Sequence, residues 1–469
     1  VYVFFQTDDG FADLPDMYID GVHMTPEGDF EGRADNEMGT DLVAADINGD
    51  SCDELLIGSG HAQGSLEFNR LRLFGFASLY MSEQSDEQPS GCVLGDTAAV
   101  TFNPTDTGRD GRMGWSVDAA DFNGDCVDDL VVSRYDGPTS SGSVYIFEGN
   151  PEWSSESRLY LTDLDASVTM TGEGSDRFGV GLATGDINGD QRMDLLVHSR
   201  YGEQPGQSAY DTGEISIFHG LIDGSQCDGP ETPDSPWFAE PEQGAGESDV
   251  PSQFFGTAMD VIEDADGDGI NDVVLFAERS RTSEVEWQRH GGPMWRPSSA
   301  ESWNYPDWIA LERPEADDGD QLGFQTRRAG DINDDGYTDF VVTSTGYDRL
   351  VQRTGYVENQ ATAGAAFVLF GGADGLPSSP DLKIADHSGH GWSDRLGYAV
   401  VPGADFDGDG VDDLIISAPY EDSHGLCQPC RVDSYIGDMG MIAVYRGGQG
   451  FGGRLQEGEP VPSLSSPDY

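Results

Sequence analysis

Six short acidic loops repeat along the chain, and their oxygen-bearing side chains fall at one constant spacing. In the loop that runs from Asp405 to Asp413, carboxylates occupy positions 1, 3, 5 and 9. Ca²⁺ is a hard cation that takes about six to eight oxygen ligands from carboxylates, amides, backbone carbonyls and water. Alternating oxygen side chains in a tight loop, with a backbone carbonyl at position 7 and an acid at position 9, therefore predict a calcium site.

The same spacing recurs in all six loops, which we number in chain order. Glycine at position 4 of every loop except loop 5 permits the backbone angles that such a turn needs. The predicted side-chain ligands are Asp46, Asn48, Asp50 and Glu54 in loop 1; Asp121, Asn123, Asp125 and Asp129 in loop 2; Asp186, Asn188, Asp190 and Asp194 in loop 3; Asp264, Asp266, Asp268 and Asp272 in loop 4; Asp331, Asn333, Asp335 and Asp339 in loop 5; and Asp405, Asp407, Asp409 and Asp413 in loop 6.

These loops differ from an EF-hand, in which a Glu at position 12 follows and helices flank the loop. Here an apolar, β-branched stretch follows directly, as at Leu414-Ile-Ile-Ser417. A set of acidic β-turns without any ion is the alternative, because Asp, Asn and Gly are ordinary turn formers. Six copies with one spacing favour the metal site.

The loops begin at residues 46, 121, 186, 264, 331 and 405, so the repeat is 65 to 78 residues long. A period of this size indicates a repeat array or a propeller rather than separate domains. Each repeat opens with a bulky residue followed by Gly, as in Phe178-Gly179, and continues through a first strand into the acidic loop. The second strand is an unbroken apolar run such as Leu130–Ser133, which is typical of a strand buried on both faces.

Two further strands are expected in each repeat. The third alternates apolar and polar residues and is predicted at 71–74 in the first repeat and, weakly, at 284–287 in the fourth. The fourth is more polar and is predicted at 158–161 and 382–385. Four short antiparallel strands per repeat, arranged around a ring, predict an all-β propeller. An open β-solenoid is the rival, and its repeats are usually much shorter.

The order of a Phe-Gly pair, an acidic loop and a strand that ends in Ser417-Ala418-Pro419 resembles the FG-GAP repeat. That repeat builds the seven-bladed propeller at the head of integrin α subunits and of many secreted bacterial proteins. The resemblance covers nearly the whole chain and implies a seven-bladed β-propeller of four-stranded antiparallel blades, with structural Ca²⁺ at up to six sites. It also implies that position 7 binds through its carbonyl, which comes from Cys52, Val127, Arg192, Ile270, Tyr337 and Val411.

Two departures from the FG-GAP pattern bear on these expectations. Glu54 replaces Asp at position 9 of loop 1, which predicts a distorted first site. Only the sixth repeat keeps Ala-Pro after its second strand, which weakens any prediction of loop shape there.

We expect one propeller domain over residues 1–469, with six full blades and half of another. Residues 1–20 align with strands three and four of a repeat, and the matching first two strands are missing. Residues upstream of Val1, the segment after Gly447, or a neighbouring chain that adds a strand in trans could complete this half blade. The third route would build a polymer. The expected divisions are 1–37 for the half blade, then 38–112, 113–177, 178–254, 255–321, 322–395 and 396–469 for the full blades.

Composition and charge restrict the expected cellular compartment and the expected binding partners. The formal charge is −63, from 87 acids and 24 bases, so neither nucleic acid nor an anionic membrane is expected as a partner. The sequence has no initiator Met, no signal peptide and no apolar run that could span a bilayer, which suggests a processed or incompletely covered protein. Six cysteines fit an oxidising, extracellular compartment. Cys427 and Cys430 are expected to form a local disulfide, and Cys52 and Cys126 lie inside acidic loops, with their partners left open.

The sequence therefore favours a secreted or surface-displayed binding protein over an enzyme. Its role would be adhesion, ligand display or the building of a filament or matrix, with a protein or carbohydrate ligand on the face formed by the variable loops. The alternative is the propeller domain of a hydrolase or lyase that acts on polysaccharide or phospholipid, although no catalytic residue can be singled out. Candidate ligand-binding features, each with a plain packing or loop alternative, are the loops 201–212, 345–364 and 420–437, the tryptophans Trp287, Trp295, Trp303 and Trp308, and the pair His387 and His390.

Overall fold

The structure is a computed structural model, and it describes the chain in segments that together hold most of the predicted strands. The described residues are 2–3, 17–18, 22–24, 30–32, 40–60, 75–84, 92–95, 97–105, 111–136, 141–202, 213–222, 227, 237–239, 242–245, 255–262, 270–277, 292–296, 309–310, 322–347, 349–353, 356–360, 364–373, 375–377, 379–385, 396–398, 400–404, 411–418, 441–445, 447–448 and 463–465.

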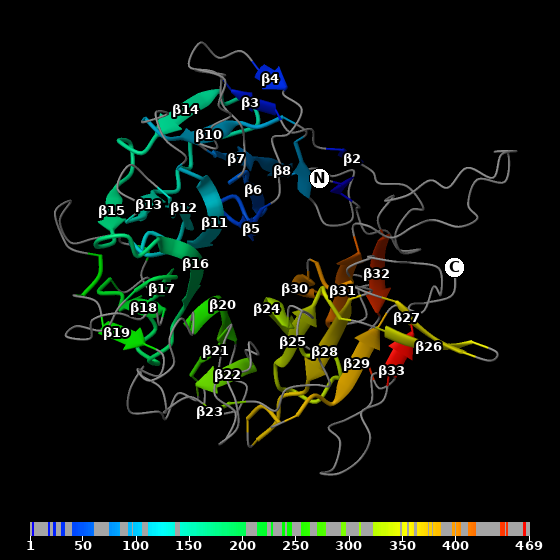
Figure 1. Ribbon diagram of the computed structural model, residues 1–469. Coiled ribbons are helices and arrows are strands. Elements are labelled where there is room, and N and C mark those ends of the chain that lie inside the picture. Colours follow the sequence, from blue (N-terminus) through cyan, green and yellow to red (C-terminus); the bar gives the residue numbers. More distant parts are fainter. Residues whose placement is uncertain are drawn as a thin grey trace, which may run out of the picture. The chain divides into compact units, whose positions relative to one another are not determined.

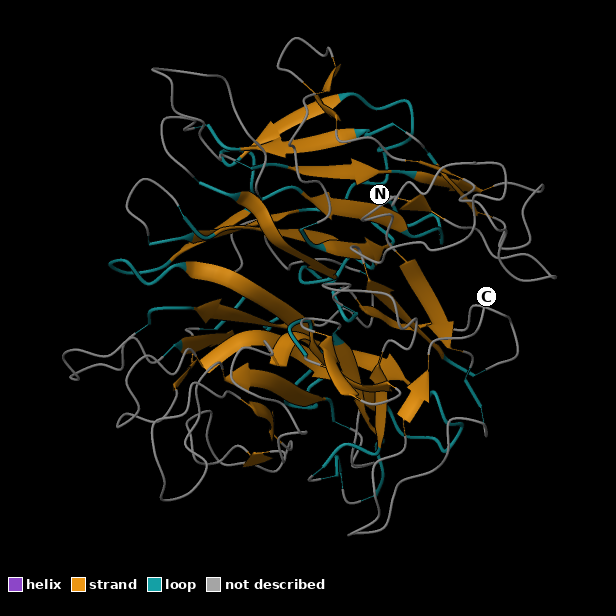
Figure 2. Ribbon diagram, turned by 45° about the vertical axis from the view of Figure 1, so that its right-hand side comes forward, coloured by secondary structure: helices purple, strands orange, loops and turns teal. Residues whose placement is uncertain are grey.

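Every regular element in the described residues is a β-strand, and Figure 2 shows strands and loops with no helix. The chain falls into two compact units, Val1–Phe254 and Phe255–Tyr469. The boundary coincides with a predicted repeat boundary, and each unit is described by itself. We number the main sheets 1 to 6 after the acidic loops that they carry. No helix in the described residues is long and apolar enough to cross a membrane.

The first unit holds sheets 1 to 3 (Figure 1). Three small hairpins accompany them: β1 (Tyr2–Val3) with β2 (Met17–Tyr18), β3 (Val22–Met24) with β4 (Phe30–Gly32), and β8 (Ser82–Gln84) with β9 (Cys92–Leu94). In spatial order, sheet 1 is β14 (Leu159–Thr162), β10 (Val100–Asn103), β7 (Ala77–Tyr80), β6 (Glu54–Gly58) and β5 (Leu42–Ala45); sheet 2 is β11 (Met113–Ala120), β12 (Asp129–Arg134), β13 (Ser143–Phe147) and β15 (Val168–Thr171); and sheet 3 is β16 (Phe178–Gly185), β17 (Asp194–Ser199), β18 (Glu214–Phe218) and β19 (Glu242–Ala245).

The second unit holds sheets 4 to 6 and one further hairpin, β26 (Arg349–Arg353) with β27 (Tyr356–Gln360). In spatial order, sheet 4 is β20 (Phe255–Ile262), β21 (Asp272–Ala277), β22 (Gly292–Arg296) and β23 (Ile309–Ala310); sheet 5 is β24 (Leu322–Gly330), β25 (Asp339–Ser344), β28 (Ala365–Leu369), β29 (Leu382–Ala385) and β33 (Ser463–Ser465); and sheet 6 is β30 (Val400–Ala404), β31 (Asp413–Ala418) and β32 (Met441–Tyr445).

The second strand of a repeat is buried on both faces, as its apolar run predicts. All six residues of β12 are buried. Leu130 and Val132 belong to the core shared with sheet 1, whereas Val131 belongs to the core shared with sheet 3. The same alternation occurs in the second unit, where Val341 of β25 packs with sheet 6 and Phe340 packs with sheet 4. Neighbouring sheets within each unit are therefore held together by their apolar faces.

The bulky residue at the start of the second, third and sixth repeats forms a bridge to the preceding sheet. Met113 forms a parallel bridge with Gly75, and Phe178 forms the same bridge with Gly142. Gly114 has φ +74°, and a Cβ at this position would lie 2.2 Å from the carbonyl oxygen of Phe76. Glycine is required here because the backbone both turns left-handed and approaches the neighbouring sheet.

The prediction for the fourth strand of the second repeat is wrong. Residues 159–162 form β14, which pairs in parallel with β10 at the outer edge of sheet 1. The fourth strand of sheet 2 is β15, which pairs antiparallel with β13. The prediction at 382–385 is confirmed, because β29 pairs antiparallel with β28. Sheet 5 also gains a parallel strand at its edge, because β33 pairs in parallel with β29 as β14 does with β10.

Two third strands also lie elsewhere than predicted. The third strand of sheet 1 is β7, and that of sheet 4 is β22. The segments 71–74 and 284–287 themselves lie outside the described residues. The third strands of sheets 2, 3, 5 and 6 are β13, β18, β28 and β32.

The N-terminal half repeat pairs as expected for strands three and four, with Tyr2 opposite Tyr18 and Val3 opposite Met17. Residues 463–465 pair with β29 of sheet 5. That short segment of the C-terminal stretch is therefore not the one that completes the N-terminal half blade.

Candidate functional site

Each acidic loop joins the first and second strands of its sheet, so two strand ends fix it in place. Loops 1, 2, 3 and 5 are described in full, and loops 4 and 6 only from position 7 onward. The predicted ligands that lie outside the described residues are Asp264, Asp266, Asp268, Asp405, Asp407 and Asp409.

The carboxylate at position 1 organises the loop around itself. In loop 1, Asp46 accepts hydrogen bonds from the N–H groups of Gly49 (2.7 Å), Asp50 (3.1 Å) and Ser51 (2.9 Å). Asp121 in loop 2 and Asp186 in loop 3 accept the corresponding three bonds. In loop 5, Asp331 accepts the bonds from positions 5 and 6.

The side chains at positions 3 and 5 continue the pattern. The amide oxygen of Asn123 accepts a hydrogen bond from the N–H of Asp125 (2.9 Å), and the carboxylate of Asp125 accepts one from the N–H of Val127 (3.0 Å). Asn123 and Asp125 thus each accept a hydrogen bond from the N–H group two residues further on. The alternation that predicted ligands also specifies the shape of the loop.

The carboxylate at position 9 is buried in every fully described loop. Asp129 accepts hydrogen bonds from Phe122 N (3.1 Å), Gly149 N (3.1 Å) and Asn123 Nδ2 (3.1 Å). Burial raises the pKa of Asp129 to about 8, and repulsion from Asp125 and Asp121 adds to the rise. Burial likewise raises the pKa of Asp339 to about 8 and that of Glu54 to about 7. At position 9, therefore, the surrounding protein stabilises the negatively charged form of the carboxyl group poorly.

A glycine that the sequence reasoning missed supports position 9. Gly149, Gly220 and Gly371 each follow a third strand and donate an N–H bond to the position-9 carboxylate, at 3.1, 2.8 and 2.9 Å. A Cβ on Gly149 would lie 2.5 Å from the carbonyl oxygen of Asp128 at position 8 of loop 2. The only signal in the sequence is a Gly after the end of the third strand, as in Phe147-Glu-Gly149.

Loop 1 departs from this arrangement at two places. Ser82 stands where sheets 2, 3, 5 and 6 have this glycine, and Glu54 stands where the other loops have Asp. Glu54 nevertheless accepts from Ile47 N (2.8 Å) and Ser82 N (3.3 Å), the same two kinds of bond that Asp129 accepts. Loop 1 therefore keeps the hydrogen bonds of the other loops with a longer side chain.

The donor set of these loops fits Ca²⁺, because it consists of carboxylate, amide and carbonyl oxygens. In loop 5 both amide atoms of Asn333 at position 3 are buried and have no hydrogen-bond partner. An unpaired buried amide oxygen is costly unless something binds it. In the described part of the chain, no three His, Cys, Asp or Glu side chains converge closely enough to hold a metal ion.

Loop 3 contains a histidine that the sequence reasoning did not place there. His219 Nδ1 lies 3.3 Å from Asp194 Oδ1 and 3.2 Å from Asn188 Nδ2. It follows the third strand β18 directly and precedes Gly220. Its ring therefore lies beside positions 3 and 9 of the loop.

Two acidic loops contain a disulfide-bonded cysteine. Cys126 at position 6 of loop 2 forms a disulfide with Cys227, 101 residues later. Cys52 in loop 1 is also disulfide-bonded. Cys427 and Cys430 lie outside the described residues, as do His387, His390 and the tryptophans at 287, 303 and 308. Of the tryptophan group, Trp295 is described only as part of the backbone of β22.

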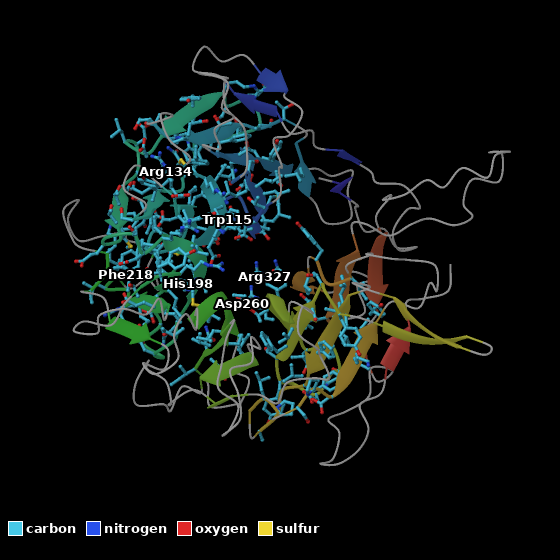
Figure 3. The ribbon with its side chains drawn as sticks, viewed as in Figure 1. Trp115, Arg134, His198, Phe218, Asp260 and Arg327 are labelled. Carbon is cyan, nitrogen blue, oxygen red and sulfur yellow. A yellow bond between two sulfur atoms is a disulfide. The ribbon has the colours of Figure 1, made fainter. Side chains whose placement is uncertain are left out.

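Two charged clusters away from the loops were not predicted. In the first unit, the Arg112 guanidinium lies 5.4 Å from the ring centre of Tyr135, and that of Arg177 lies 5.8 Å from the same ring. In the second unit, Asp260 of β20 accepts a hydrogen bond from Arg328 N (3.1 Å) and lies near Arg327 (Figure 3). Burial raises the pKa of Asp260, and the charges of the two arginines partly oppose the rise.

Two family models and several known proteins match parts of this chain. Residues 396–431 match the FG-GAP repeat, and residues 121–197 match the FG-GAP-like repeat. "Integrin alpha pat-2" of Caenorhabditis briggsae is 23% identical over 321 residues, which are 65% of this chain and 18% of that protein. "Phosphatidylinositol-glycan-specific phospholipase D" of Dictyostelium discoideum is 30% identical over 203 residues, 39% of this chain and 19% of that protein.

The chain thus spans only about a fifth of the length of the curated relatives that it matches. Among solved structures, the exotype rhamnogalacturonan lyase YesX covers 88% of this chain and 73% of its own, at 10% identity and a TM-score of 0.35. That score is too low to support an argument about fold or function.

Proposed function

Because the chain is an FG-GAP repeat protein of the integrin α-like kind, we propose that it is an extracellular, calcium-stabilised β-propeller that binds a protein or carbohydrate ligand in adhesion. The proposed propeller has seven blades of four antiparallel strands. Sheets 2, 3 and 4 have four antiparallel strands, and neighbouring sheets within each unit share apolar cores, which supports this arrangement.

The observation that carries the calcium part of the proposal is the buried carboxylate at position 9. Asp129 and Asp339 are fully buried, and their pKa values are raised to about 8 by burial and by neighbouring carboxylates. In loop 2, the groups that would hold the ion are Asp121, Asn123, Asp125, Asp129 and the carbonyl of Val127. A bound Ca²⁺ would supply positive charge that offsets the repulsion among these groups. The ion is therefore proposed to be structural and not catalytic.

Calorimetric titration of the chelated protein with Ca²⁺ tests the proposal, together with the melting temperature in chelator and in excess Ca²⁺. We expect binding at up to six sites and a melting temperature that falls substantially in chelator. A double variant, Asp121→Asn with Asp125→Asn, should lose one site, whereas Glu156→Gln removes an exposed charge outside the loops and should lose none. Identical melting in chelator and in Ca²⁺, with no measurable binding, would reject the proposal.

The proposed ligand face is the one formed by the variable loops, and the N-terminal half blade offers a route to self-assembly. The antiparallel pairing of β1 with β2 supports their assignment as the third and fourth strands of a blade. Completion of this half blade in trans would give chains that associate end to end. Sedimentation of the purified protein tests that route, since a strict monomer at all concentrations would contradict it.

A second candidate function is catalytic, because a named phospholipase D is 30% identical over 203 residues. In that case the chain would be the propeller domain of a secreted enzyme that acts on phospholipid or polysaccharide. Incubation with a glycosylphosphatidylinositol-anchored protein and with acidic polysaccharides would separate the two functions. Product formation that survives purification would favour the enzyme, whereas binding without turnover would favour adhesion.

A further inference from the structure

The acidic loops of neighbouring sheets contact each other through a residue that is not among the predicted ligands. Asp128 occupies position 8 of loop 2, next to the buried ligand Asp129. Its carboxylate accepts a hydrogen bond from the N–H of Asp46 (3.2 Å), which is position 1 of loop 1. The N–H of Asp128 in turn donates to the carbonyl of Asp46 (3.0 Å). Asp128 therefore forms hydrogen bonds with both the backbone N–H and the backbone carbonyl of Asp46, a predicted ligand in loop 1.

A third hydrogen bond belongs to the same contact. Asn150 lies directly after Gly149, the glycine that supports position 9 of loop 2, and its N–H donates to the carbonyl of Ile47 (2.9 Å). Two segments that shape loop 2 thus also fix the first two residues of loop 1. Loops 1 and 2 are therefore joined by three hydrogen bonds.

The same contact recurs in the second unit. Asp412 occupies position 8 of loop 6 and accepts a hydrogen bond from the N–H of Asp331 (2.9 Å), position 1 of loop 5. Gly448 corresponds to Asn150, and its N–H donates to the carbonyl of Ile332 (2.9 Å). In both units, therefore, an aspartate at position 8 of one loop accepts a hydrogen bond from the backbone N–H at position 1 of the preceding loop.

The contact between loops 2 and 3 is of another kind. Position 8 of loop 3 is Met193, which has no carboxylate to offer Asp121. Leu221 corresponds to Asn150, and its N–H donates a hydrogen bond to the carbonyl of Trp237 instead (2.9 Å). The ring of Phe238 packs on Phe122 with ring centres 5.2 Å apart. Apolar side chains replace the carboxylate at this interface.

The repeats that are joined by a carboxylate contact are also joined by strand pairing. β14 extends from the second repeat to pair with β10 of sheet 1, and β33 extends from the sixth repeat to pair with β29 of sheet 5. Each carboxylate contact therefore joins two repeats that are already connected along their outer edges.

We propose that Asp128 is a positioning residue that couples acidic loops 1 and 2, so that divalent cation binding in either loop strengthens binding in the other. Asp412 holds loop 5 in the corresponding way. Loop 3 lacks this link and binds independently of loop 2. This inference rests on the proposed calcium function. Coupling is reciprocal, because a shift in affinity at one site requires an equal shift at the other.

Hydrogen exchange of peptides from loops 1, 2 and 3, followed across a Ca²⁺ titration of the full chain, measures each loop separately. In the unaltered protein we expect loops 1 and 2 to gain protection together. Asp128→Ala should raise the Ca²⁺ midpoint of loop 1 about tenfold, the effect of losing about 1.4 kcal/mol from one hydrogen bond to a charged group. Asp128→Asn keeps an acceptor oxygen and should restore most of the difference.

A matched control and a second variant make the test specific. Glu156 is exposed and lies outside the loops, so Glu156→Gln should leave both midpoints unchanged. Disabling loop 2 with Asp125→Asn should weaken loop 1 when Asp128 is present and have no further effect on loop 1 in Asp128→Ala. Exchange of the Asp46 amide without Ca²⁺ gives a readout that needs no ion, and Asp128→Ala should accelerate it.

The outcomes separate this inference from the proposed function. If no loop gains protection with Ca²⁺ in the unaltered protein, the calcium proposal itself fails. If the loops gain protection but Asp128→Ala leaves loop 1 unchanged, or shifts loop 3 as much as loop 1, the coupling is rejected and the calcium proposal stands. If Asp128→Ala does not fold, the Asp125→Asn variant decides alone, since an unchanged loop 1 would reject the coupling.

Discussion

The backbone N–H of Ser82 donates a hydrogen bond to the carboxylate of Glu54 at 3.3 Å, and Glu54 stands where the other five loops have an aspartate. In sheets 2, 3 and 5 a glycine donates to that aspartate, as Gly149 does to Asp129. The Ser82 hydroxyl also donates to the carbonyl of Asp53 at 2.6 Å, in space that a glycine leaves open. Ser82 therefore contacts loop 1 through both its backbone N–H and its hydroxyl.

The contact between Glu54 and Ser82 predicts non-additive substitutions. Glu54→Asp alone should lower the free energy of unfolding by about 1–3 kcal/mol, because the shorter side chain no longer reaches both Ile47 N and Ser82 N. Adding Ser82→Gly should recover part of that loss, because it lets the third strand approach the loop. Thermal unfolding of the two single variants and the double variant, in excess Ca²⁺, measures the interaction. Additive effects would show that the two residues are independent.

The close approach at Gly149 predicts a strong effect from a single methyl group. A Cβ there would lie 2.5 Å from the carbonyl oxygen of Asp128 and 2.5 Å from a methyl of Val127. Gly149→Ala should therefore destabilise the protein by about 1–3 kcal/mol through overpacking, and should weaken loop 2 by displacing the N–H that supports Asp129.

Gly181 provides the control for that substitution. It lies in β16, and a Cβ there would meet its nearest atom at 3.6 Å, an ordinary contact. Gly181→Ala should change the stability by no more than about 0.5 kcal/mol. Equal melting temperatures for the two variants would contradict the role assigned to Gly149.

The sequence predicted the parts of the fold that carry a local signature. The acidic loops and the apolar second strands were found because spacing and composition mark them within about ten residues. The fourth strand of sheet 2 was misplaced because 158–161 and 168–171 both alternate in polarity, and only pairing with a distant strand distinguishes them. β14 pairs with β10, which ends more than fifty residues earlier.

The same limit applies to the candidate site. The oxygen side chains at positions 1, 3, 5 and 9 follow from spacing alone. The roles of Gly149, Ser82 and Asp128 depend on contacts between segments that the fold brings together, such as Asp46 with Asp128 across 82 residues. A glycine or an aspartate in isolation carries no such information, so these residues could be recognised only in the folded chain.

The disulfide between Cys126 and Cys227 predicts a large loss of stability on its removal. It closes a loop of about one hundred residues, so its loss should cost about 2–5 kcal/mol, mainly by freeing the unfolded chain. Cys126 is position 6 of loop 2, whose N–H binds Asp121, so removal should also weaken Ca²⁺ binding in this loop. Cys126→Ser with Cys227→Ser tests both effects through the melting temperature and the exchange of the loop 2 peptide. Unchanged exchange in loop 2 would limit the disulfide to a general effect on stability.

The raised pKa values at position 9 predict opposite pH dependences with and without metal. The pKa values of Asp129 and Asp339 are about 8 and that of Glu54 is about 7 in the folded chain, above the ordinary values of 3.8 and 4.5. Between the two values the folded state binds more protons than the unfolded state, so the stability of the metal-free protein falls as pH rises. The loss should begin near pH 4 and level off above about pH 8.

Ca²⁺ competes with these protons for the same carboxylates, so its affinity should rise over the same pH range. In excess Ca²⁺ the melting temperature should therefore stay level or rise between pH 5 and pH 8, where that of the chelated protein falls. Asp129→Asn removes one of the titrating groups and should flatten the fall in chelator, whereas the exposed Glu156→Gln should leave it unchanged. A metal-free protein that becomes more stable toward pH 8 would show that these carboxylates are charged and already compensated, which would remove the physical reason for a cation in the loops.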